Sequence, residues 1–149
     1  MIQKVNHFSI AVKDLNQVVA FFRDILGLTS IWPIYEYEGQ ELDESTGLSG
    51  AHCRIAKIEV GSAILEFMQY LSPPGRELKG NPNDAGCPHI AFDVDNIDEM
   101  YKTLKQRGVR FKSAPLALTT DRHHPMYGWR EVDLWGPENI TLQFMQAPK

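Results

Sequence analysis

One short pattern occurs twice in this chain, about half a chain length apart. The segments N-H-F-S-I-A-V at residues 6–12 and P-H-I-A-F-D-V at residues 88–94 each place a histidine, His7 or His89, before an apolar strand. A helix-start residue and an amphipathic stretch follow each segment. Because repetition at this spacing indicates a duplicated unit of structure, the chain is predicted to contain one supersecondary module twice.

The predicted elements have the same order in both halves. Residues 1–71 and 88–149 each read as a strand, a helix and three further strands, and the Pro- and Gly-rich residues 72–87 form a linker. The elements predicted in the first module are 4–12, 15–26, 28–37, 51–60 and 63–71. Those in the second are 88–95, 97–107, 109–112, 126–134 and 139–146. The expected fold is α+β, with two βαβββ modules in one domain (residues 1–149) and the helices outside mixed sheets.

Each predicted helix begins after a short polar residue and ends before a glycine. Asp14 and Asn96 are typical N-cap residues, and Gly27 and Gly108 follow the last helical turns. Apolar residues form one stripe on each helix, which is the pattern of a helix packed on a core. The acidic residues 38–50 are predicted to form a solvated loop.

Alternation along the strands separates an apolar face from a polar one. Four polar residues each lie opposite an apolar face: His7, Glu66, His89 and Gln143. If the apolar faces pack on the helices, these four line the other side of the sheet. A single histidine on a strand is commonly a hydrogen-bonded structural residue. Imidazole, carboxylate and amide donors at matching places in two modules also suit a divalent ion such as Zn, Ni, Co, Mn or Fe.

Three further residues are candidates for substrate binding. Arg54, in the strand before Glu66, could hold a substrate anion, and a surface ion pair explains it equally well. Tyr127 and Trp129 share the alternation of the predicted strand 126–134 and could form an aromatic wall. Core packing or a dimer contact explains those two aromatic residues equally well.

Composition excludes several classes of partner. The 149 residues carry a net charge of −4 and contain no basic stripe, so a nucleic acid is not expected. The two cysteines form no disulfide framework, and the chain contains no signal peptide and no run of 18 apolar residues. We therefore expect a cytoplasmic protein that neither enters nor crosses a membrane.

Several segments together resemble the vicinal oxygen chelate superfamily, which includes glyoxalases, methylmalonyl-CoA epimerases, extradiol dioxygenases and bleomycin and fosfomycin resistance proteins. The segments are H-F-S-I-A-V-K-D-L, F-F-R-D-I-L-G-L, L-E-F-M-Q-Y, P-H-I-A-F-D-V-D-N-I-D, K-Q-R-G-V-R-F and G-P-E-N-I-T-L-Q-F. The similarity covers nearly the whole chain. It implies that the two modules form a cup of sheet around one divalent ion, and that the protein is a homodimer acting on a small molecule.

The resemblance places the four ligand positions on His7, Glu66, His89 and Gln143. The family usually has Glu in the last strand, where this chain has Gln143. Extradiol dioxygenases hold iron through that last Glu, so the pattern resembles the glyoxalase-like and epimerase-like members more closely. Glu66 is then the only carboxylate among the four ligands.

The expected function is that of a divalent-metal-dependent lyase or isomerase acting on a small α-oxygenated carbonyl compound through a metal-stabilised enediolate. Glu66 is the first candidate to move the proton. The alternative is an acid from the neighbouring acidic segment: Glu36, Glu38, Glu41 or Glu44. Two other functions stay open, namely a ring-cleaving dioxygenase and a metal-free small-molecule-binding or antibiotic-resistance protein.

Overall fold

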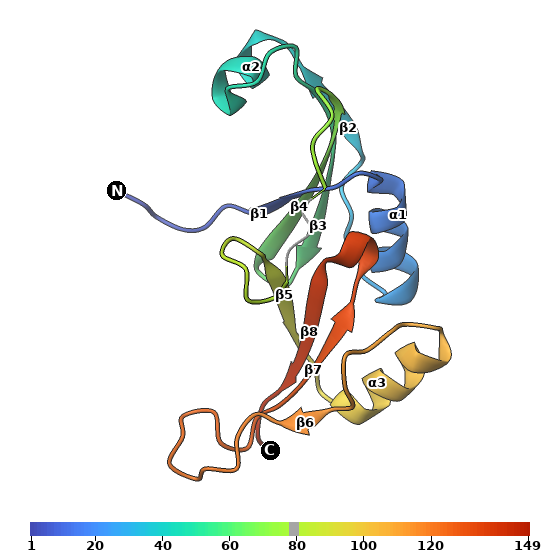
Figure 1. Cartoon of the computed structure of the whole chain (residues 1–149), viewed down its shortest axis with the longest axis vertical. Helices are drawn as coiled ribbons and strands as arrows, with labels where there is room; N and C mark the ends of the chain where they lie inside the picture. The colour runs from blue at the N-terminus through green and yellow to red at the C-terminus, as the bar shows by residue number, and fades with distance from the viewer. Residues whose placement is uncertain (78–80) are drawn as a thin grey trace. The chain divides into compact units, whose positions relative to one another are not determined.

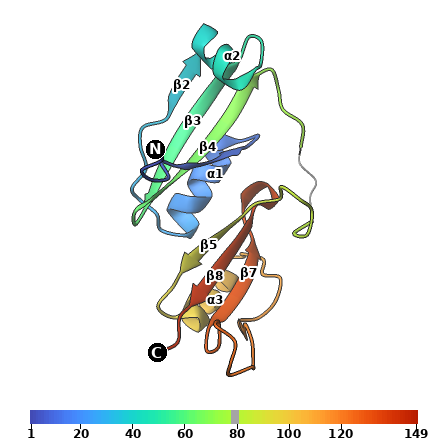
Figure 2. The same cartoon turned by 90° about the vertical axis from the view of Figure 1, so that its left-hand side faces the viewer.

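The computed structural model describes residues 1–77 and 81–149, so residues 78–80 of the predicted linker lie outside the described residues. The chain divides into two compact units, Met1–Leu78 and Lys79–Lys149. Each unit is a four-stranded sheet with a helix lying against one face (Figures 1 and 2).

In the first unit the sheet has the strand order β1-β4-β3-β2. Strand β1 runs parallel to β4, and the other neighbours are antiparallel. The helix α1 continues into a π-helical segment, η1. The elements are β1 (Phe8–Ala11), α1 (Leu15–Ala20), η1 (Phe21–Ile25), β2 (Tyr35–Glu38), α2 (Gln40–Thr46), β3 (His52–Val60) and β4 (Ala63–Ser72).

The second unit repeats this topology. Its sheet has the order β5-β8-β7-β6, with β5 parallel to β8 and the rest antiparallel. The elements are β5 (His89–Asp93), α3 (Ile97–Gln106), β6 (Leu116–Ala117), β7 (Arg130–Trp135), the short 3₁₀ helix η2 (Pro137–Asn139) and β8 (Thr141–Gln146). The predicted α+β class and the duplicated βαβββ order are confirmed.

The acidic segment 38–50 contains a helix, and the prediction of a loop was wrong. Leu42 in α2 is only 2% exposed and is buried with Ala51, Cys53 and Ile55. Both carboxylate oxygens of Asp43 accept backbone N–H bonds from Gly50 and Ala51, at 2.8 and 2.6 Å. The helix is therefore fixed by one buried side chain and one acidic side chain, and neither produces an apolar periodicity in the sequence.

Several predicted strands are shorter than expected. Strand β2 begins only at Tyr35, with an isolated bridge from Ile31 to Ile58 before it, because Pro33 has no N–H to donate to a sheet. The predicted strand 109–112 is reduced to a bridge between Phe111 and Leu134. Strand β7 begins at Arg130 after a series of turns, four residues later than predicted.

Each core lies between the sheet and its helix. In the first unit, Phe22 of η1 and Phe67 of β4 are fully buried, with ring centroids 5.0 Å apart. The corresponding core of the second unit contains Ile97, Leu104, Val132, Leu134, Leu142 and Phe144, each at most 2% exposed. Fully burying a side chain of this size contributes about 1.5–3 kcal/mol, so the apolar strand faces hold each helix in place.

Strand β1 departs from its predicted burial. Phe8, Ile10 and Val12 were expected to share a buried face, yet Phe8 is 58% exposed while Val12 is 8% exposed. Strand β1 is an edge strand, and only its C-terminal end leads directly into α1 (Figure 1). Burial therefore decreases along the strand with distance from the helix.

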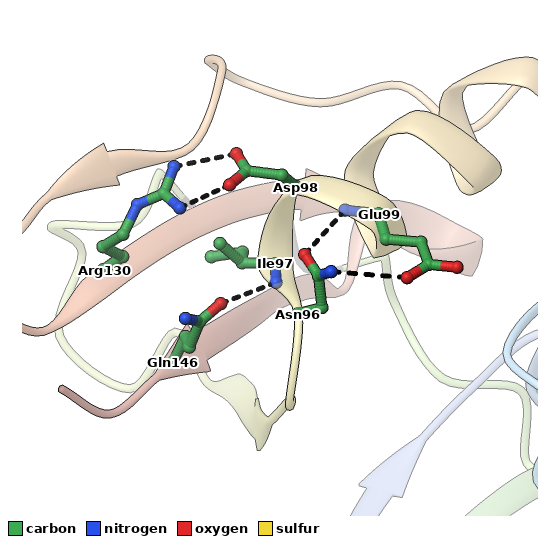
Figure 3. Close-up of polar contacts among 6 residues, drawn as sticks. All are labelled: Asn96, Ile97, Asp98, Glu99, Arg130 and Gln146. Atoms are coloured by element: carbon green, nitrogen blue, oxygen red, sulfur yellow. Dashed lines mark hydrogen bonds and ion pairs between the residues drawn. The ribbon is translucent and has the colours of Figure 1, made fainter. Parts of the chain in front are cut away.

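The first turn of α3 is tied to the sheet by side chains (Figure 3). Asn96 accepts a bond from Glu99 N at 3.1 Å and donates to the Glu99 carboxylate at 3.3 Å. The side-chain oxygen of Gln146 accepts from Ile97 N at 2.8 Å, and Arg130 donates two bonds to Asp98 at 2.6 and 2.8 Å. These contacts satisfy backbone N–H groups that a helix start leaves without partners. The term helix anchor is used below for Arg130 and Gln146 together with the helix residues that they bind.

The first unit has the same helix anchor. Gln69 accepts from Leu15 N at 3.3 Å, and Arg54 donates to Asn16 at 3.1 Å and to Gln69 at 3.4 Å. The register pairs Arg54 with Gln69, just as it pairs Arg130 with Gln146. Arg54 and Arg130 are therefore repeat counterparts, and each holds the second residue of its helix.

Candidate metal and substrate site

In the first unit, His7 and Glu66 come together on the face away from α1. His7 Nε2 lies 3.3 Å from Glu66 Oε1, and Lys57 Nζ lies 3.2 Å from Glu66 Oε2. Glu66 pairs with Ser9 of β1 and with Lys57 of β3, which explains why these side chains share one face. Glu66 is only 6% exposed, so each oxygen of its carboxylate faces a nitrogen rather than open solvent.

The neighbouring Asn6 determines which nitrogen of His7 is available. His7 Nδ1 lies 2.7 Å from Asn6 Oδ1. With the Asn6 amide in this orientation the imidazole proton is on Nδ1, because an amide oxygen only accepts. The lone pair of Nε2 in a neutral imidazole then faces the carboxylate of Glu66. Two acceptors at this distance need a cation between them, which is either a second imidazole proton or a metal ion.

The geometry of this pair fits a divalent ion. At metal–ligand distances of about 2.0–2.2 Å, neighbouring ligand atoms of a tetrahedral or octahedral ion lie about 2.8–3.6 Å apart. His7 Nε2 and Glu66 Oε1 lie within that range at 3.3 Å. Metal-bound histidines also donate their other N–H to an oxygen acceptor, which is the role that Asn6 has here.

The charge of Glu66 affects its whole sheet face. The hydrogen bond to Glu66 raises the pKa of Lys57 above its ordinary value. Burial raises the pKa of the Cys53 thiol, and the negative charge of Glu66 raises it further. Burial, with smaller contributions from Cys53 and Glu66, also raises the pKa of Tyr70. Helix α2 covers the end of this face at Cys53, so the carboxylate lies in a partly enclosed, weakly solvated environment.

In the second unit, the amide of Gln143 is held by two carboxylates. Its Nε2 donates to Glu131 Oε2 at 2.9 Å and to Asp133 Oδ1 at 3.0 Å. Carboxylates of this kind only accept, so both N–H donors of the amide are used and its orientation is determined. The amide oxygen then remains as the atom that Gln143 can offer to a cation.

His89 lies on the same sheet face as Gln143. Strand β5 pairs with β8 so that Ala91, two residues after His89, lies beside Gln143. Burial and the charge of Asp133 raise the pKa of Glu131, and His89 acts in the opposite direction. His89, Gln143 and Glu131 therefore belong to one electrostatic cluster within the second unit.

The two units carry opposite charge patterns at corresponding positions. Glu66 on β4 has the cation Lys57 as its cross-strand neighbour, whereas Gln143 on β8 has the anion Asp133. A cation therefore faces the carboxylate in the first unit, and acids orient the amide in the second. The difference gives one unit an anionic donor and the other a neutral donor.

Of the predicted substrate-binding residues, Arg54 is not placed beside Glu66. It belongs to the helix anchor, on the face that packs against α1. Of the acids considered as an alternative base, Glu36 lies 2.9 Å and Glu38 3.8 Å from His52, in the same edge region of the sheet. The ion-pair contacts of Glu66 are with His7 and Lys57.

Tyr127 and Trp129 lie before strand β7 instead of within it. Tyr127 N donates to His124 O, and Trp129 N donates to Met126 O, in consecutive turns. The alternation that grouped these two aromatic residues does not extend to this segment, because the strand starts at Arg130. Within the described part of the chain, the side-chain bonds of Gln143 go to Glu131 and Asp133 and not to either aromatic residue.

Sequence reasoning missed four polar residues that contact the candidate ligands: Asn6, Lys57, Glu131 and Asp133. Strand alternation contained the signal for three of them, because Lys57, Glu131 and Asp133 share a face with Glu66 or Gln143. Asn6 precedes β1 and gave no such signal. Within residues 1–77 and 81–149, His, Cys, Asp and Glu side chains form no group of three or more suited to a metal ion.

Two βαβββ modules with polar residues at corresponding strand positions define an α+β protein built by duplication. The chain belongs to the glyoxalase/bleomycin resistance protein/dioxygenase superfamily, whose family model matches residues 4–124. The resemblance to the vicinal oxygen chelate superfamily is thereby confirmed. No helix within the described residues is long and apolar enough to cross a membrane.

Relatives of known activity include epimerases. The chain is 28% identical over 148 residues to a 2-epi-5-epi-valiolone epimerase from Actinomyces sp., covering 97% of this chain and 79% of that protein. It is 28% identical over 118 residues to the human mitochondrial methylmalonyl-CoA epimerase, covering 77% of this chain and 60% of that protein. Both relatives are enzymes that invert a stereocentre.

Solved structures share the fold. A glyoxalase family protein from Bacillus cereus matches with a TM-score of 0.82 at 22% identity, over 100% of this chain and 97% of that one. The fosfomycin resistance protein FosX from Listeria monocytogenes, solved with Mn(II) and sulfate, matches with a TM-score of 0.61 at 19% identity, over 99% and 94%. At these identities the likeness establishes the fold alone.

Proposed function

We propose that the protein is a divalent-metal-dependent isomerase or lyase, and that His7, Glu66, His89 and Gln143 hold its ion. The observation that carries this proposal is the pair His7 Nε2 and Glu66 Oε1, two acceptor atoms that face each other at 3.3 Å while Asn6 binds the other imidazole nitrogen. The second unit adds an imidazole and an oriented amide on one sheet face. The family's Mn(II)-bound member supports the choice of a divalent ion.

The donor set determines what chemistry the site would support. Two neutral imidazoles, one carboxylate and one amide would leave a divalent ion with a net charge of +1. When bound, such an ion would act as a Lewis acid toward a carbonyl oxygen of the substrate and lower the barrier to removing the adjacent proton. A second carboxylate in place of Gln143 would neutralise that charge.

Glu66 is the residue proposed to carry the proton. Its carboxylate is buried, and Lys57 Nζ lies 3.2 Å from Oε2. A base in this environment can take a proton from the carbon beside a carbonyl, and an acid on the opposite face of the resulting planar carbon must return a proton for the stereocentre to invert. Return to the opposite face is an epimerisation, which is the activity of the two enzymes described above.

The substrate is proposed to be a small α-oxygenated carbonyl compound, and the protein a homodimer. Glu131 is a second carboxylate near Gln143, and burial raises its pKa.

A ring-cleaving dioxygenase is a weaker candidate, because β8 carries the amide of Gln143 where that chemistry uses a carboxylate ligand. A metal-free binding protein is weaker because all four donor positions are retained.

Proton exchange tests this function directly. The untagged protein is loaded with Mn(II), Zn(II), Ni(II) or Co(II) and incubated in D₂O with a panel of 2-oxo and 2-hydroxy thioesters and hemithioacetals, and deuterium at the α-carbon is followed by NMR. We expect metal-dependent exchange in the native protein and a loss of about 100-fold or more in Glu66→Gln.

Glu59→Gln is the matched control, because Glu59 lies on the same hairpin but is exposed and bonds to Trp32 and Ser30 instead. It should retain exchange close to the native rate. Full exchange in Glu66→Gln would reject the role of Glu66. A rate that is unchanged by removing every divalent ion would reject the metal-dependent function altogether.

A further inference from the structure

We infer that the second unit contains a separate binding pocket for a small organic anion with a planar apolar group. A pocket of about 430 Å³, about half open to solvent, lies where α3, residues 109–113 and the end of β7 meet. This volume is within the range of about 300–1,000 Å³ that is typical of small-molecule sites. None of the four proposed metal ligands lines it, so the pocket goes beyond the proposed function.

Aromatic side chains from three elements form the apolar walls. Tyr101 and Phe111 pack edge to face, with centroids 4.7 Å apart, and Trp135 lies at the end of β7 with 37% of its surface exposed. The backbone bond from Trp135 N to Arg110 O, at 2.9 Å, holds the segment against β7. The walls therefore belong to ordered elements and offer ring faces and edges to a planar ligand.

The polar part of the lining is cationic. Lys105 and Arg110 line the cavity together with Ser113, and no carboxylate does so among the described residues. Lys105 Nζ donates to the hydroxyl of Tyr101 at 2.9 Å and lies 5.0 Å from its ring centroid. No ion pair formed by residues 1–77 and 81–149 includes Lys105 or Arg110.

This charge distribution selects the ligand. In a chain with a net charge of −4, two cations without an acidic partner in one concave site form a local positive potential. The guanidinium of Arg110 matches the paired oxygens of a carboxylate or phosphate, and Ser113 can donate a further bond. The aromatic walls favour a ligand whose remaining part is planar and apolar. A simple aromatic acid has both features.

A nearby lysine contacts both the pocket wall and the proposed metal site. Lys112 Nζ lies 4.6 Å from the ring centroid of Trp135, donates to Thr141 Oγ1 at 3.0 Å, and lies 3.7 Å from Asp133. Asp133 accepts from Gln143. The pocket is thus adjacent to the second unit's candidate ligand but has its own lining, so the two sites can be tested separately.

Binding to the full-length, EDTA-treated protein tests the pocket without any metal. The probes are benzoate, phenyl phosphate, inorganic phosphate and neutral benzamide, each titrated by calorimetry and by NMR shifts of the Trp135 indole, assigned with Trp135→Phe. We expect benzoate and phenyl phosphate to bind and to shift that signal. Benzamide and inorganic phosphate should each bind at least about tenfold more weakly, because each lacks one of the two features.

Variants locate the site. Arg110→Gln and Lys105→Gln should each weaken binding of the aromatic anions by about tenfold, and Arg110→Lys should have an intermediate effect. Lys102→Gln, on the same helix but outside the cavity lining, should bind within about twofold of the native protein. Two variants on different elements keep the test valid if one of them fails to fold.

Three results would overturn the inference. The first is benzamide binding as tightly as benzoate, which would remove the role of charge. The second is inorganic phosphate binding as tightly as phenyl phosphate, which would remove the aromatic walls. The third is folded Arg110→Gln and Lys105→Gln proteins that bind like Lys102→Gln. Since no metal is present, none of these results bears on the proposed enzymatic function.

Discussion

At the scale of single residues, the orientation of His7 determines which of its ring nitrogens faces Glu66. Asn6 binds Nδ1 at 2.7 Å, and this contact directs the Nε2 lone pair toward Glu66. Gln143 is oriented in a comparable way, through its two bonds to Glu131 and Asp133. In both units, a neighbour that would not itself bind the ion determines which atom of the ligand is offered.

Replacing Asn6 tests this orientation. Asn6→Ala removes the acceptor for His7 Nδ1 and should weaken Mn(II) binding by about 10–100-fold, which is the usual cost of losing such a partner. Asn6→Asp retains an acceptor and should bind at least as tightly as the native protein. Both affinities are measured by isothermal titration calorimetry. Equal affinities in Asn6→Ala and the native protein would show that Asn6 does not orient the histidine.

The two cysteines should differ in reactivity. Cys53 is fully buried and has a raised thiol pKa, while Cys87 is partly exposed. Because only the thiolate reacts rapidly, Ellman's reagent at pH 8 should modify one thiol quickly and the second only when the protein unfolds. Cys87→Ser should abolish the fast phase and Cys53→Ser should retain it. A fast phase in Cys87→Ser would show that Cys53 is accessible.

At the scale of elements, the helix anchors explain how each helix is held on its sheet. Arg130 donates two bonds to Asp98, and Arg54 donates to Asn16 at the corresponding place. The bond from Arg130 lowers the pKa of Asp98 below its ordinary value. A lowered carboxyl pKa stabilises the fold at pH values above the unfolded pKa of about 3.9, and this stability is lost as the pH falls through the folded pKa.

Denaturation across pH tests the anchor. Arg130→Gln should unfold at a lower urea concentration than the native protein at pH 7, and this difference should narrow as the pH falls below the unfolded pKa of about 3.9 toward the lower pKa of folded Asp98. Arg122→Gln, an exposed charge change in the turn region before β7, should show no gap that depends on pH in this way. A gap in Arg130→Gln that stays constant from pH 7 to pH 3 would contradict the ion pair.

The strand faces could be predicted from the sequence, whereas helix α2 and the contacts of Arg54 could not. Alternation placed His7 and Glu66 on one face, as it placed His89 and Gln143, because burial of Phe67 or Phe144 determines strand register. Helix α2 was missed, since one buried leucine produces no periodic pattern. Arg54 was a candidate for substrate binding or an ion pair, and its bond to Asn16 was not predicted because an arginine on a strand gives no sign of which helix residue it will bind. Contacts between side chains that are distant in sequence cannot be derived from the pattern of residue types alone.

At the scale of the whole molecule, duplication gives two units with the same strand order and different site chemistry. One contributes an imidazole and a buried carboxylate beside Lys57, and the other an imidazole and an amide beside Asp133. The proposed ligand set takes two of its four donors from each unit, His7 and Glu66 from the first and His89 and Gln143 from the second. The proposed function therefore requires that both units contribute to one ion.

Metal stoichiometry in single-histidine variants tests this requirement most directly. We predict one Mn(II) per native chain by calorimetry, and a loss of about 100-fold or more in affinity in His7→Ala and His89→Ala alike. His52→Ala, whose imidazole pairs with Glu36 instead, should bind as the native protein does. Native affinity in either His7→Ala or His89→Ala would contradict a single ion held by both units.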